Sequence, residues 1–498
     1  MKATLIIKDE ANVKIKGLDV SLRKKLVNKF KFILPYARHL PSVKLGRWDG
    51  SIAFFQLGGS TFINLLPEII PILYDAGYEI ELQDERTYRT DYTFKPVTND
   101  SYSHIKWGKG HRLEGEPIVF NDHQVEAINN FFADTQSMQE IATGAGKTVI
   151  TAALSHACEE HKGRTIVVVP NRSLVKQTEE DYKLMGLDVG VIFGGRHEYD
   201  HTHTIATWQS LSKMNKDKNG LSLEEFVAGS HLNFERFVAG EDDPRRIIAI
   251  IVDECHGMKA EVLKGMMQGP FAQVPIRWGV TGTIPKEDFD FFALKTSIGD
   301  VIGEVTAKEL QEKGILAKCN VNILQLKDWG DYGNYQSEMK YLTGDVERLK
   351  QISNIITHIS EDGNVLLLVN HIKTGMTLEQ MIPNSVFLSG KDKDEKRKEE
   401  FEKAHEEDHI VIIATYGIAA VGLNIPRIFN LAMLEPGKSF VRVIQSIGRG
   451  LRLAHDKDHV EVWDITSTCK YAKRHLTQRK KYYKEVQYPF TITKLDRD

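Results

Sequence analysis

The amino-acid sequence predicts an α/β protein with two parallel-sheet domains in tandem behind a small N-terminal α+β domain. In the first of these, expected over 113–305, short β-branched runs such as 165–169 and 247–252 alternate with amphipathic stretches. A second series of the same kind lies within an expected domain of 306–468. Continuous apolar runs separated by amphipathic segments are typical of parallel strands covered by helices on both faces. A chain of 498 residues is also too long for one hydrophobic core.

The N-terminal segment, 1–112, has a different pattern from the rest of the chain. It begins with two strand-like alternating stretches and a helix-like stretch, which together indicate a small α+β domain. Between 11 and 48 it carries ten Lys and Arg residues against one acid, Asp19. This imbalance favours a surface that contacts nucleic-acid phosphates, and a merely solvated basic face is the alternative. The basic residues singled out for such contacts are Lys24, Lys25, Lys29 and Arg47.

Three other segments interrupt the alternation of strands and helices. Segment 94–115 is rich in Asn, Ser, Gly and Lys, which predicts a linker. Segment 212–246 is polar and charged, which indicates an insertion between core elements. Segment 469–498 is basic, and we expect it to form a C-terminal tail that is at least partly helical.

Composition excludes several classes of protein. The formal net charge of −3 argues against a globally basic nucleic-acid coat, so nucleic-acid contacts must come from local patches. The four cysteines form no C-x-x-C pair, which argues against a zinc module or disulfide framework and fits a reducing compartment. No apolar run approaches 18 residues in length. We therefore expect a cytoplasmic protein that makes no membrane contact.

The stretch 143–148 is typical of a phosphate-binding loop. Its glycines let backbone N–H groups turn towards phosphate oxygens, Lys147 can reach the β- and γ-phosphates, and the Thr148 hydroxyl can bind Mg²⁺. The full G-x-x-x-x-G-K-[ST] pattern has glycine at the position of Ile141, so the loop departs from it there. The residues expected to contact the nucleotide here are Thr143, Gly144, Ala145, Gly146, Lys147 and Thr148.

Two carboxylates, Asp253 and Glu254, follow the apolar run 247–252. Nucleotide hydrolysis needs one acid to hold the metal ion and one base to orient the attacking water. We expect Asp253 to serve the metal and Glu254 the water. The pairing of this strand end with the phosphate loop argues against a coincidental glycine-rich turn.

The second α/β domain has no phosphate loop of its own but carries two arginines three residues apart, Arg449 and Arg452. On a helix these side chains lie on one face. Opposite a nucleotide they could stabilise charge developing on the γ-phosphoryl group. On spacing alone, an ordinary surface helix with two arginines is the alternative.

The ordered series of motifs between about 120 and 466 resembles that of the superfamily-2 helicases. The series comprises TGAGKT (143–148), VVVPNRSLVKQ (167–177), TWQSL (207–211), DECH (253–256), TGT (281–283), LLLVNHIKTG (366–375), ATYGIAAVGLNIP (414–426) and QSIGRGLR (445–452). The resemblance implies two RecA-like domains that hold ATP and Mg²⁺ between them, with Gln124 reading adenine. It also implies nucleotide contacts from Gly422 and Asn424.

The same resemblance assigns further roles. It implies that His256, Thr281, Thr283 and Gln445 couple the state of ATP to the second domain. The residues it implies for backbone-directed strand contacts are Arg172, Thr207, Gln209, His371 and Thr415.

Departures from the DEAD-box pattern narrow the resemblance. The acidic motif is DECH, Gln445 stands where DEAD-box RNA helicases usually have His, and Asn424 stands where Asp is common. These residues point to the DNA-directed branch. The G-x-W-D-G-x-I stretch from Gly46 to Ile52 and the short basic tail resemble the UvsW-type branched-DNA helicases of phages.

The resemblance implies an ATP-dependent, monomeric enzyme that remodels Holliday junctions, stalled forks and R-loops. Its partners would be single-stranded, duplex and branched DNA, and an RNA–DNA hybrid in R-loops. It would lie in the host cytoplasm if a phage encodes it. A duplex translocase that separates no strands, an RNA helicase and an ATP-gated nucleic-acid clamp remain as alternatives.

Overall fold

The computed structural model describes residues 1–34, 36–109, 111, 113–217, 220–232, 245–257, 260–285, 287–390, 392, 399–400, 403–404, 406–419, 427–439, 447 and 457–496. Contacts divide the chain into two compact units. Unit 1 comprises Met1–Glu140 with Lys147–Glu304, and unit 2 comprises Ile141–Gly146 with Val305–Asp498. Within the described ranges, no helix has both the length and the apolar character needed to cross a membrane.

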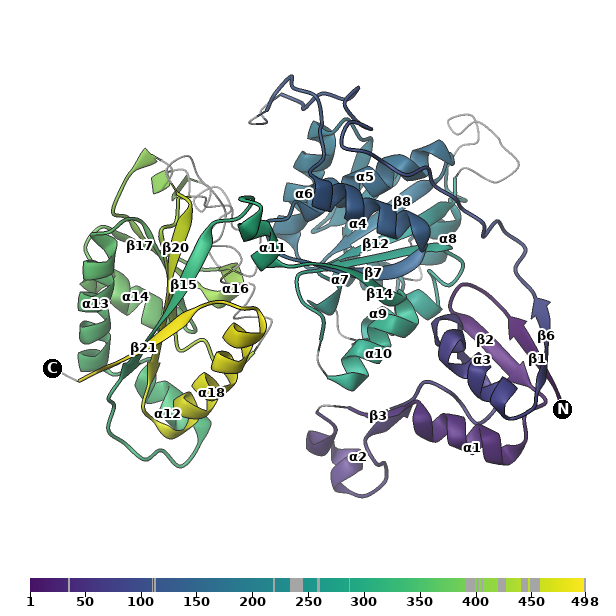
Figure 1. Ribbon diagram of the computed structural model, residues 1–498, viewed down its shortest axis with the longest axis horizontal. Coiled ribbons are helices and arrows are strands. Elements are labelled where there is room, and N and C mark those ends of the chain that lie inside the picture. The colour runs from purple at the N-terminus through teal and green to yellow at the C-terminus, as the bar shows by residue number, and fades with distance from the viewer. Residues whose placement is uncertain are drawn as a thin grey trace. The chain divides into compact units, whose positions relative to one another are not determined.

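The N-terminal part of unit 1 is built on a four-stranded sheet in the order β5-β2-β1-β6 (Figure 1). Its central strands β1 and β2 are antiparallel, whereas β1 and β6 are parallel. Helix α1 starts where the Asp19 side chain accepts a hydrogen bond from the Leu22 N–H group at 2.8 Å. The predicted small α+β domain is therefore present. Its elements are β1 (Lys2–Ile7), β2 (Asn12–Lys16), α1 (Val20–Lys29), β3 (Lys31–Ile33), α2 (Pro41–Lys44), β4 (Ser51–Ala53), β5 (Ser60–Phe62), α3 (Leu66–Asp75) and β6 (Glu79–Asp84).

This N-terminal part shares its hydrophobic core with helix α10 (Asp288–Ser297) of the same unit. Phe289 and Ala293 of α10 are buried among its apolar side chains, and the Phe292 ring lies 4.2 Å from that of Phe32. The Lys295 ammonium also pairs with the Glu68 carboxylate at 2.7 Å. Removing the N-terminal residues would therefore expose apolar surface of the neighbouring domain.

The rest of unit 1 is built on an eight-stranded sheet in the order β10-β9-β11-β8-β12-β13-β7-β14. Strands β9, β11, β8, β12, β13 and β7 run parallel to one another, as the continuous apolar runs predict, whereas β10 is antiparallel to β9. Because crossovers between parallel strands are right-handed, α5 and α6 lie on one face and α7, α8 and α9 on the other. Figure 1 shows α5 and α6 above the strands and α9 below them. The elements are α4 (Asp122–Ala133), β7 (Gln136–Ile141), α5 (Lys147–Glu160), β8 (Arg164–Val169), α6 (Arg172–Leu184), β9 (Val189–Phe193), β10 (Arg196–His197), β11 (His203–Thr207), α7 (Trp208–Met214), α8 (Leu223–Ala228), β12 (Ile247–Asp253), α9 (Ala260–Gln268), β13 (Ile276–Thr281) and β14 (Asp300–Val305).

Two segments that interrupt the sequence pattern are attached to this sheet. In the described part of 94–115, the Val97 N–H group donates to the Asn129 side chain and the Gly108 N–H group to the Leu184 carbonyl, both at 2.8 Å. In 212–246, helix α8 buries Leu223 and Phe226 in the core of unit 1. The insertion thus contributes apolar side chains to the core, which its polar composition conceals.

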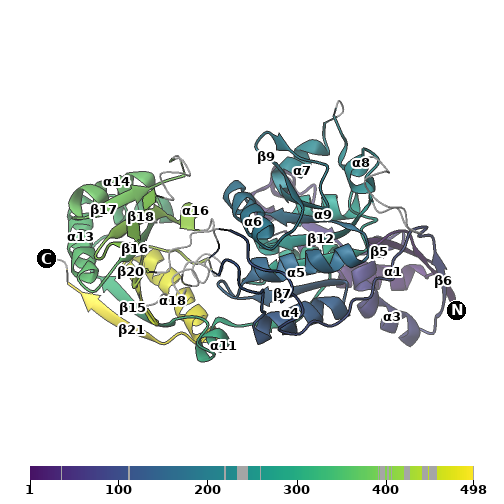
Figure 2. The ribbon, with the colours of Figure 1, turned by 90° about the horizontal axis from the view of Figure 1, so that it is seen from above.

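Unit 2 contains a seven-stranded sheet in the order β17-β18-β16-β19-β20-β15-β21, and every neighbouring pair is parallel. Helices α13 and α14 cover one face and α18 the other (Figures 1 and 2), as right-handed crossovers require. The elements are α11 (Ala307–Glu312), β15 (Lys318–Leu326), α12 (Tyr335–Leu342), α13 (Val346–Ser360), β16 (Val365–Val369), α14 (Ile372–Met381), β17 (Ser385–Leu388), β18 (Val411–Thr415), α16 (Tyr416–Ala419), β19 (Asn430–Leu434), β20 (His459–Ser467), α18 (Lys470–Glu485) and β21 (Phe490–Leu495).

The segment predicted as a basic C-terminal tail, 469–498, is built into this unit. Helix α18 packs on the sheet, and β21 pairs with β15 as its edge strand. Within α18, Leu476, Arg479 and Tyr483 are buried. These residues recur at helical spacing, so the helix has one face towards the sheet and a basic face outside.

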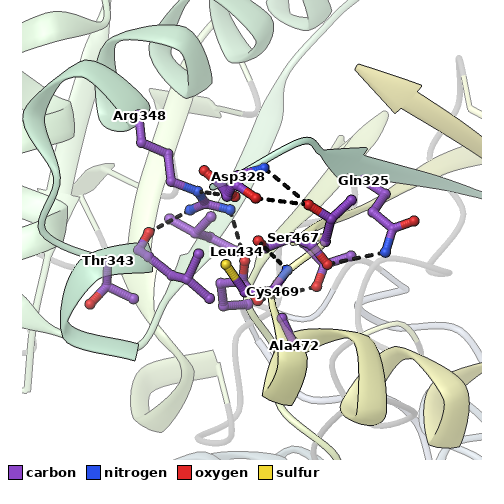
Figure 3. A network of polar contacts seen from close by, with 12 residues as sticks. Gln325, Asp328, Thr343, Arg348, Leu434, Ser467, Cys469 and Ala472 are labelled. Carbon is purple, nitrogen blue, oxygen red and sulfur yellow. Dashed lines mark hydrogen bonds and ion pairs between the residues drawn. The ribbon is translucent and has the colours of Figure 1, made fainter. Parts of the chain in front are cut away.

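A buried polar network lies at the carboxyl end of the unit 2 sheet (Figure 3). The Arg348 guanidinium donates to Asp328 at 3.0 Å and to Glu435 at 2.8 Å. Beside them, Arg479 forms a bidentate pair with Asp464 at 2.8 and 2.9 Å. Two guanidinium groups thus face three buried carboxylates. Burial raises the pKa of Glu435 to about 7, although Arg348 and Arg479 oppose the shift.

This excess carboxylate predicts a specific pH dependence of stability. Because the pKa of Glu435 in the folded protein lies near 7, above its ordinary value of 4.5, the folded state binds this proton more tightly. The contribution of Glu435 to stability is thus full below about pH 4.5 and is lost as pH rises through 7, by roughly 3 kcal/mol at most. Glu435→Gln should flatten this dependence between pH 5 and 8 in thermal unfolding. A variant with an unchanged slope would contradict the assignment.

Candidate nucleotide and nucleic-acid sites

Lys147, near the end of the phosphate loop, and the acidic strand end meet within unit 1 through one ion pair. The Lys147 ammonium, in the first turn of α5, lies 2.9 Å from a carboxylate oxygen of Glu254, directly after β12. Both side chains are largely buried. Residues more than 100 positions apart in sequence are thus neighbours, as the motif pairing predicts. Glu254 has a φ of 47°, in the left-handed region where non-glycine residues are uncommon and where strain gathers at functional sites.

The structure explains why the loop lacks glycine at 141. Ile141 is the last residue of β7 and is fully buried, so an apolar side chain is favoured at this position. The backbone turns further along, where Gly144 and Gly146 have φ values of 90° and 84°. A side chain at Gly144 would be strained and would place its Cβ 2.7 Å from the Leu316 side chain. The loop therefore favours glycine at these two positions, because their φ values are positive.

The DECH and TGT motifs are joined by short polar contacts. The Nδ1 atom of His256 lies 2.5 Å from the Thr281 hydroxyl, which donates to the Thr283 carbonyl at 2.9 Å. Because that hydroxyl has only one hydrogen, Nδ1 of His256 is the donor to it. Burial lowers the pKa of His256, which keeps the ring neutral. The Gly282 N–H group in turn donates to Glu254 at 3.4 Å. Three of the four predicted coupling residues therefore form one chain of contacts with Glu254.

Gln124 occupies a fixed position at the start of α4. It is buried, and its side-chain oxygen accepts a hydrogen bond from the Asn121 N–H group at 2.9 Å. This contact is half of a capping box, which holds the first turn of the helix. Its reading of adenine stays a prediction.

The predicted strand contacts follow the carboxyl ends of parallel strands, where ligands bind in open α/β sheets. In unit 1, Arg172 and Gln209 are exposed after β8 and β11. In unit 2, His371 is exposed after β16, and Thr415 is half-buried at the end of β18. Thr207 differs, because it is buried and its hydroxyl accepts from the Ser210 N–H group to cap α7. Its contact with a strand stays a prediction.

The basic residues of the N-terminal part lie on its surface. Lys24, Lys25 and Lys29 are exposed on α1, whereas Leu22 and Leu26 of the same helix are buried. Arg47, after α2, is exposed as well. Five predicted residues of the second domain lie outside the described residues, and they are Gly422, Asn424, Gln445, Arg449 and Arg452.

Comparison with known proteins adds two family matches. Residues 117–286 match the family model of the type III restriction enzyme res subunit, and residues 347–454 match that of the helicase conserved C-terminal domain. The chain is also 22% identical over 474 residues to the ATP-dependent DNA helicase uvsW of Enterobacteria phage T4, covering 91% of this chain and 88% of that one. The chain is an ATP-dependent helicase of superfamily 2. The first match contains Lys147, Asp253 and Glu254.

The helicase is also similar to a DNA translocase and to one further solved structure. It is 24% identical over 201 residues to the DNA 3′-5′ translocase XPB2 of Sulfurisphaera tokodaii, covering 40% of this chain and 39% of that one. The structure of the ATP-dependent Type ISP restriction-modification enzyme LlaBIII bound to DNA superimposes with a TM-score of 0.54 and 14% identity. That superposition covers 87% of the helicase and 36% of LlaBIII, and it supports the two-domain fold.

Proposed function

We propose that this helicase uses ATP and Mg²⁺ to unwind and remodel branched DNA, such as Holliday junctions, stalled forks and R-loops. The observation that carries the proposal is the extent of the likeness to the T4 helicase. A 474-residue match extends well beyond the two family matches at 117–286 and 347–454. Because it covers 91% of the chain, it must include part of the N-terminal segment that precedes residue 117.

The proposed ATP chemistry uses residues at the carboxyl end of the unit 1 sheet. The Thr148 hydroxyl and the Asp253 carboxylate are hard oxygen donors of the kind that Mg²⁺ prefers, so the pair fits this ion. Lys147 would bind the β- and γ-phosphates, and Glu254 would orient the attacking water. Bound Mg²⁺ would supply charge neutralisation on the phosphate oxygens.

The arginines of unit 2 complete the proposal for ATP. Arg449 and Arg452 would stabilise the charge that develops on the γ-phosphoryl group. Gly422 and Asn424 would contact the nucleotide, and Gln445 would join the coupling set. These roles come from the motif series.

The proposed strand path uses groups directed at the DNA backbone. Arg172 and Gln209 in unit 1 and His371 and Thr415 in unit 2 would contact phosphates and sugars, so binding should be insensitive to base sequence. Successive closing and opening of the ATP site would step the strand along. The same contacts could serve the DNA strand of an RNA–DNA hybrid.

The N-terminal basic face should hold the duplex arms of a junction. Charge reversal at Lys24, Lys25 and Lys29 should leave basal ATPase activity unchanged, because these exposed residues lie outside the proposed ATP site. Unwinding of branched DNA should fall sharply. Each lost phosphate contact should also reduce the slope of log affinity against log salt by roughly 0.9 for duplex DNA.

A matched control is reversal at Lys213 and Lys216, which are exposed elsewhere in unit 1. Charge reversal is preferable to deletion of 1–112, because deletion would uncover Phe289 and Ala293 of the shared core. A folded triple variant with normal salt dependence of binding and normal junction unwinding would show that the basic face does not hold the duplex arms.

Comparing ATPase stimulation and strand separation on four DNA substrates tests the proposal as a whole. Single-stranded, duplex, four-way and R-loop substrates are used at equal nucleotide concentration. We expect the strongest stimulation and unwinding with the four-way and R-loop substrates. Stimulation by plain duplex without strand separation would instead support a duplex translocase, and one relative is named as a DNA translocase. Unwinding confined to RNA duplexes would support an RNA helicase.

A further inference from the structure

Unit 2 contains a pocket of about 610 Å³ between α12, α18 and the loop after β19. Figure 1 shows α12 and α18 side by side, and their Tyr335 and Tyr471 rings lie 6.1 Å apart. The ring of His475 lies 5.1 Å from that of Tyr335. The lining residues are Tyr335, Pro436, Gly437, Lys438, Ser439, Tyr471, Arg474, His475 and Gln478. A volume of this size is in the range of small-ligand sites.

Buried contacts hold the pocket walls in place. The Arg479 guanidinium, paired with Asp464 on the sheet, donates to the Gly437 carbonyl at 2.7 Å. The Tyr482 hydroxyl donates to the Lys438 carbonyl at 2.9 Å. The loop after β19 is thus tied to α18 at two successive residues. A pocket whose walls are fixed in this way loses little entropy when it binds a ligand.

The pocket combines aromatic rings with positive charge. Two tyrosines and a histidine supply aromatic rings, Lys438 and Arg474 are cationic, and none of the described lining residues is acidic. Burial, Arg479 and Lys438 lower the pKa of His475, so its ring is neutral at pH 7. The first N–H groups of α18 are already satisfied by Glu338, which accepts from Tyr471 at 3.0 Å and Ala472 at 2.7 Å. Attraction for an anion therefore comes from the side chains.

The pocket adjoins a second one, of about 630 Å³, through a shared residue. Tyr335 lines both. The second pocket is also lined by Asn370, His371 and Lys373 from the segment proposed to contact the strand. A strand lying on His371 would therefore pass Tyr335 and reach the first pocket without leaving unit 2.

We propose that the pocket between α12 and α18 binds a nucleotide of the single strand, with its base against Tyr335 and Tyr471 and its phosphate on Lys438 and Arg474. Bases stack on aromatic side chains whatever their sequence, and cationic groups follow the backbone, so the combination suits a strand bound without sequence preference. This inference rests on the proposed DNA function. It adds residues of 470–478 that lie beyond the family match ending at 454.

The test measures binding of fluorescent oligo-dT to the full chain at several salt concentrations. Tyr335→Ala with Tyr471→Ala should weaken binding roughly 5- to 100-fold, the range for loss of stacking on aromatic side chains. Tyr335→Phe with Tyr471→Phe should retain binding, because the rings remain. Lys438→Ala with Arg474→Ala should reduce the slope of log affinity against log salt by roughly 1.4, which is about 0.7 for each lost phosphate contact.

The matched control is Lys473→Ala with Lys484→Ala, two exposed residues of α18 that do not line the pocket. The variant with Lys473→Ala and Lys484→Ala should bind oligo-dT with wild-type affinity. Photocrosslinking with 5-iodouracil oligonucleotides should label Tyr335 or Tyr471. Normal affinity in the folded tyrosine variant, with crosslinks elsewhere, would overturn the proposal.

Two further outcomes separate this inference from the proposed function. If the wild-type chain binds no oligonucleotide and DNA does not stimulate its ATPase activity, the proposed function itself is contradicted. If DNA stimulates the wild type but the pocket variants lose basal ATPase activity without DNA, the loop after β19 serves ATP, and the pocket assignment is wrong.

Discussion

Replacing Lys147 by alanine is expected to abolish ATP turnover in a chain that still folds and binds DNA. Lys147 lies in the first turn of α5, and its ammonium contacts the Glu254 carboxylate at 2.9 Å. Its role is thus electrostatic, and the apolar core of unit 1 does not depend on it. Without the ammonium, the β- and γ-phosphates lose their main cationic side chain in the loop. Steady-state ATPase assays with and without DNA measure the loss.

The matched control is Lys213→Ala, an exposed lysine in the last turn of α7, which should hydrolyse ATP normally. Circular dichroism and oligonucleotide binding would confirm that the Lys147→Ala chain is folded. Near-normal ATPase activity in that folded chain would show that this loop is not the nucleotide site.

Replacing Glu254 by glutamine is expected to trap ATP, with binding retained and turnover at least ~10²-fold slower, as for loss of a general base. Glutamine keeps the size of the side chain and one acceptor oxygen for Lys147 and Gly282. What it lacks is the basic carboxylate beside the proposed position of the attacking water. Nucleotide affinity and single-turnover hydrolysis should be measured separately.

Glu224→Gln is the control for the Glu254 variant, because Glu224 is exposed on α8 and plays no part in the proposed site. A Glu254→Gln chain that fails to bind ATP would show that this carboxylate organises the site structurally. The left-handed backbone at Glu254 is unaffected by the change, since glutamine and glutamate have the same branching.

Much of the fold and of the candidate nucleotide site could be predicted because the signals are local. The run Ile247–Val252 is apolar without interruption. Such a run is typical of a buried parallel strand, whichever segments of the chain pair with it. Lys147 and Glu254 could be paired before the structure, because a phosphate loop and an acidic strand end serve one reaction. The glycine missing at 141 is a departure that only the buried end of β7 explains.

Other features could not be predicted, because no short pattern encodes them. Thr207 fits a strand-contact motif, yet its hydroxyl caps α7. The acidic, polar surroundings of α8 conceal that Phe226 is buried in the core. In the pocket between α12 and α18, the spacing of Tyr471, Arg474, His475 and Gln478 indicates one helical face, but Tyr335 joins them only in space.

The sequence by itself determined the class of fold, and it predicted that the phosphate loop and the acidic strand end lie together. Periodicity and motifs involve residues that are close in sequence. Backbone sterics and the functional groups of those residues therefore decide the local structure and its chemistry. The tertiary structure alone decided which distant segments share a core or a sheet. It buried Phe289 in the N-terminal core, paired Lys318–Leu326 with Phe490–Leu495, and placed Arg348 between Asp328 and Glu435. Such pairings depend on the burial of whole surfaces and on compensation of buried charge, both of which are properties of the folded chain as a whole.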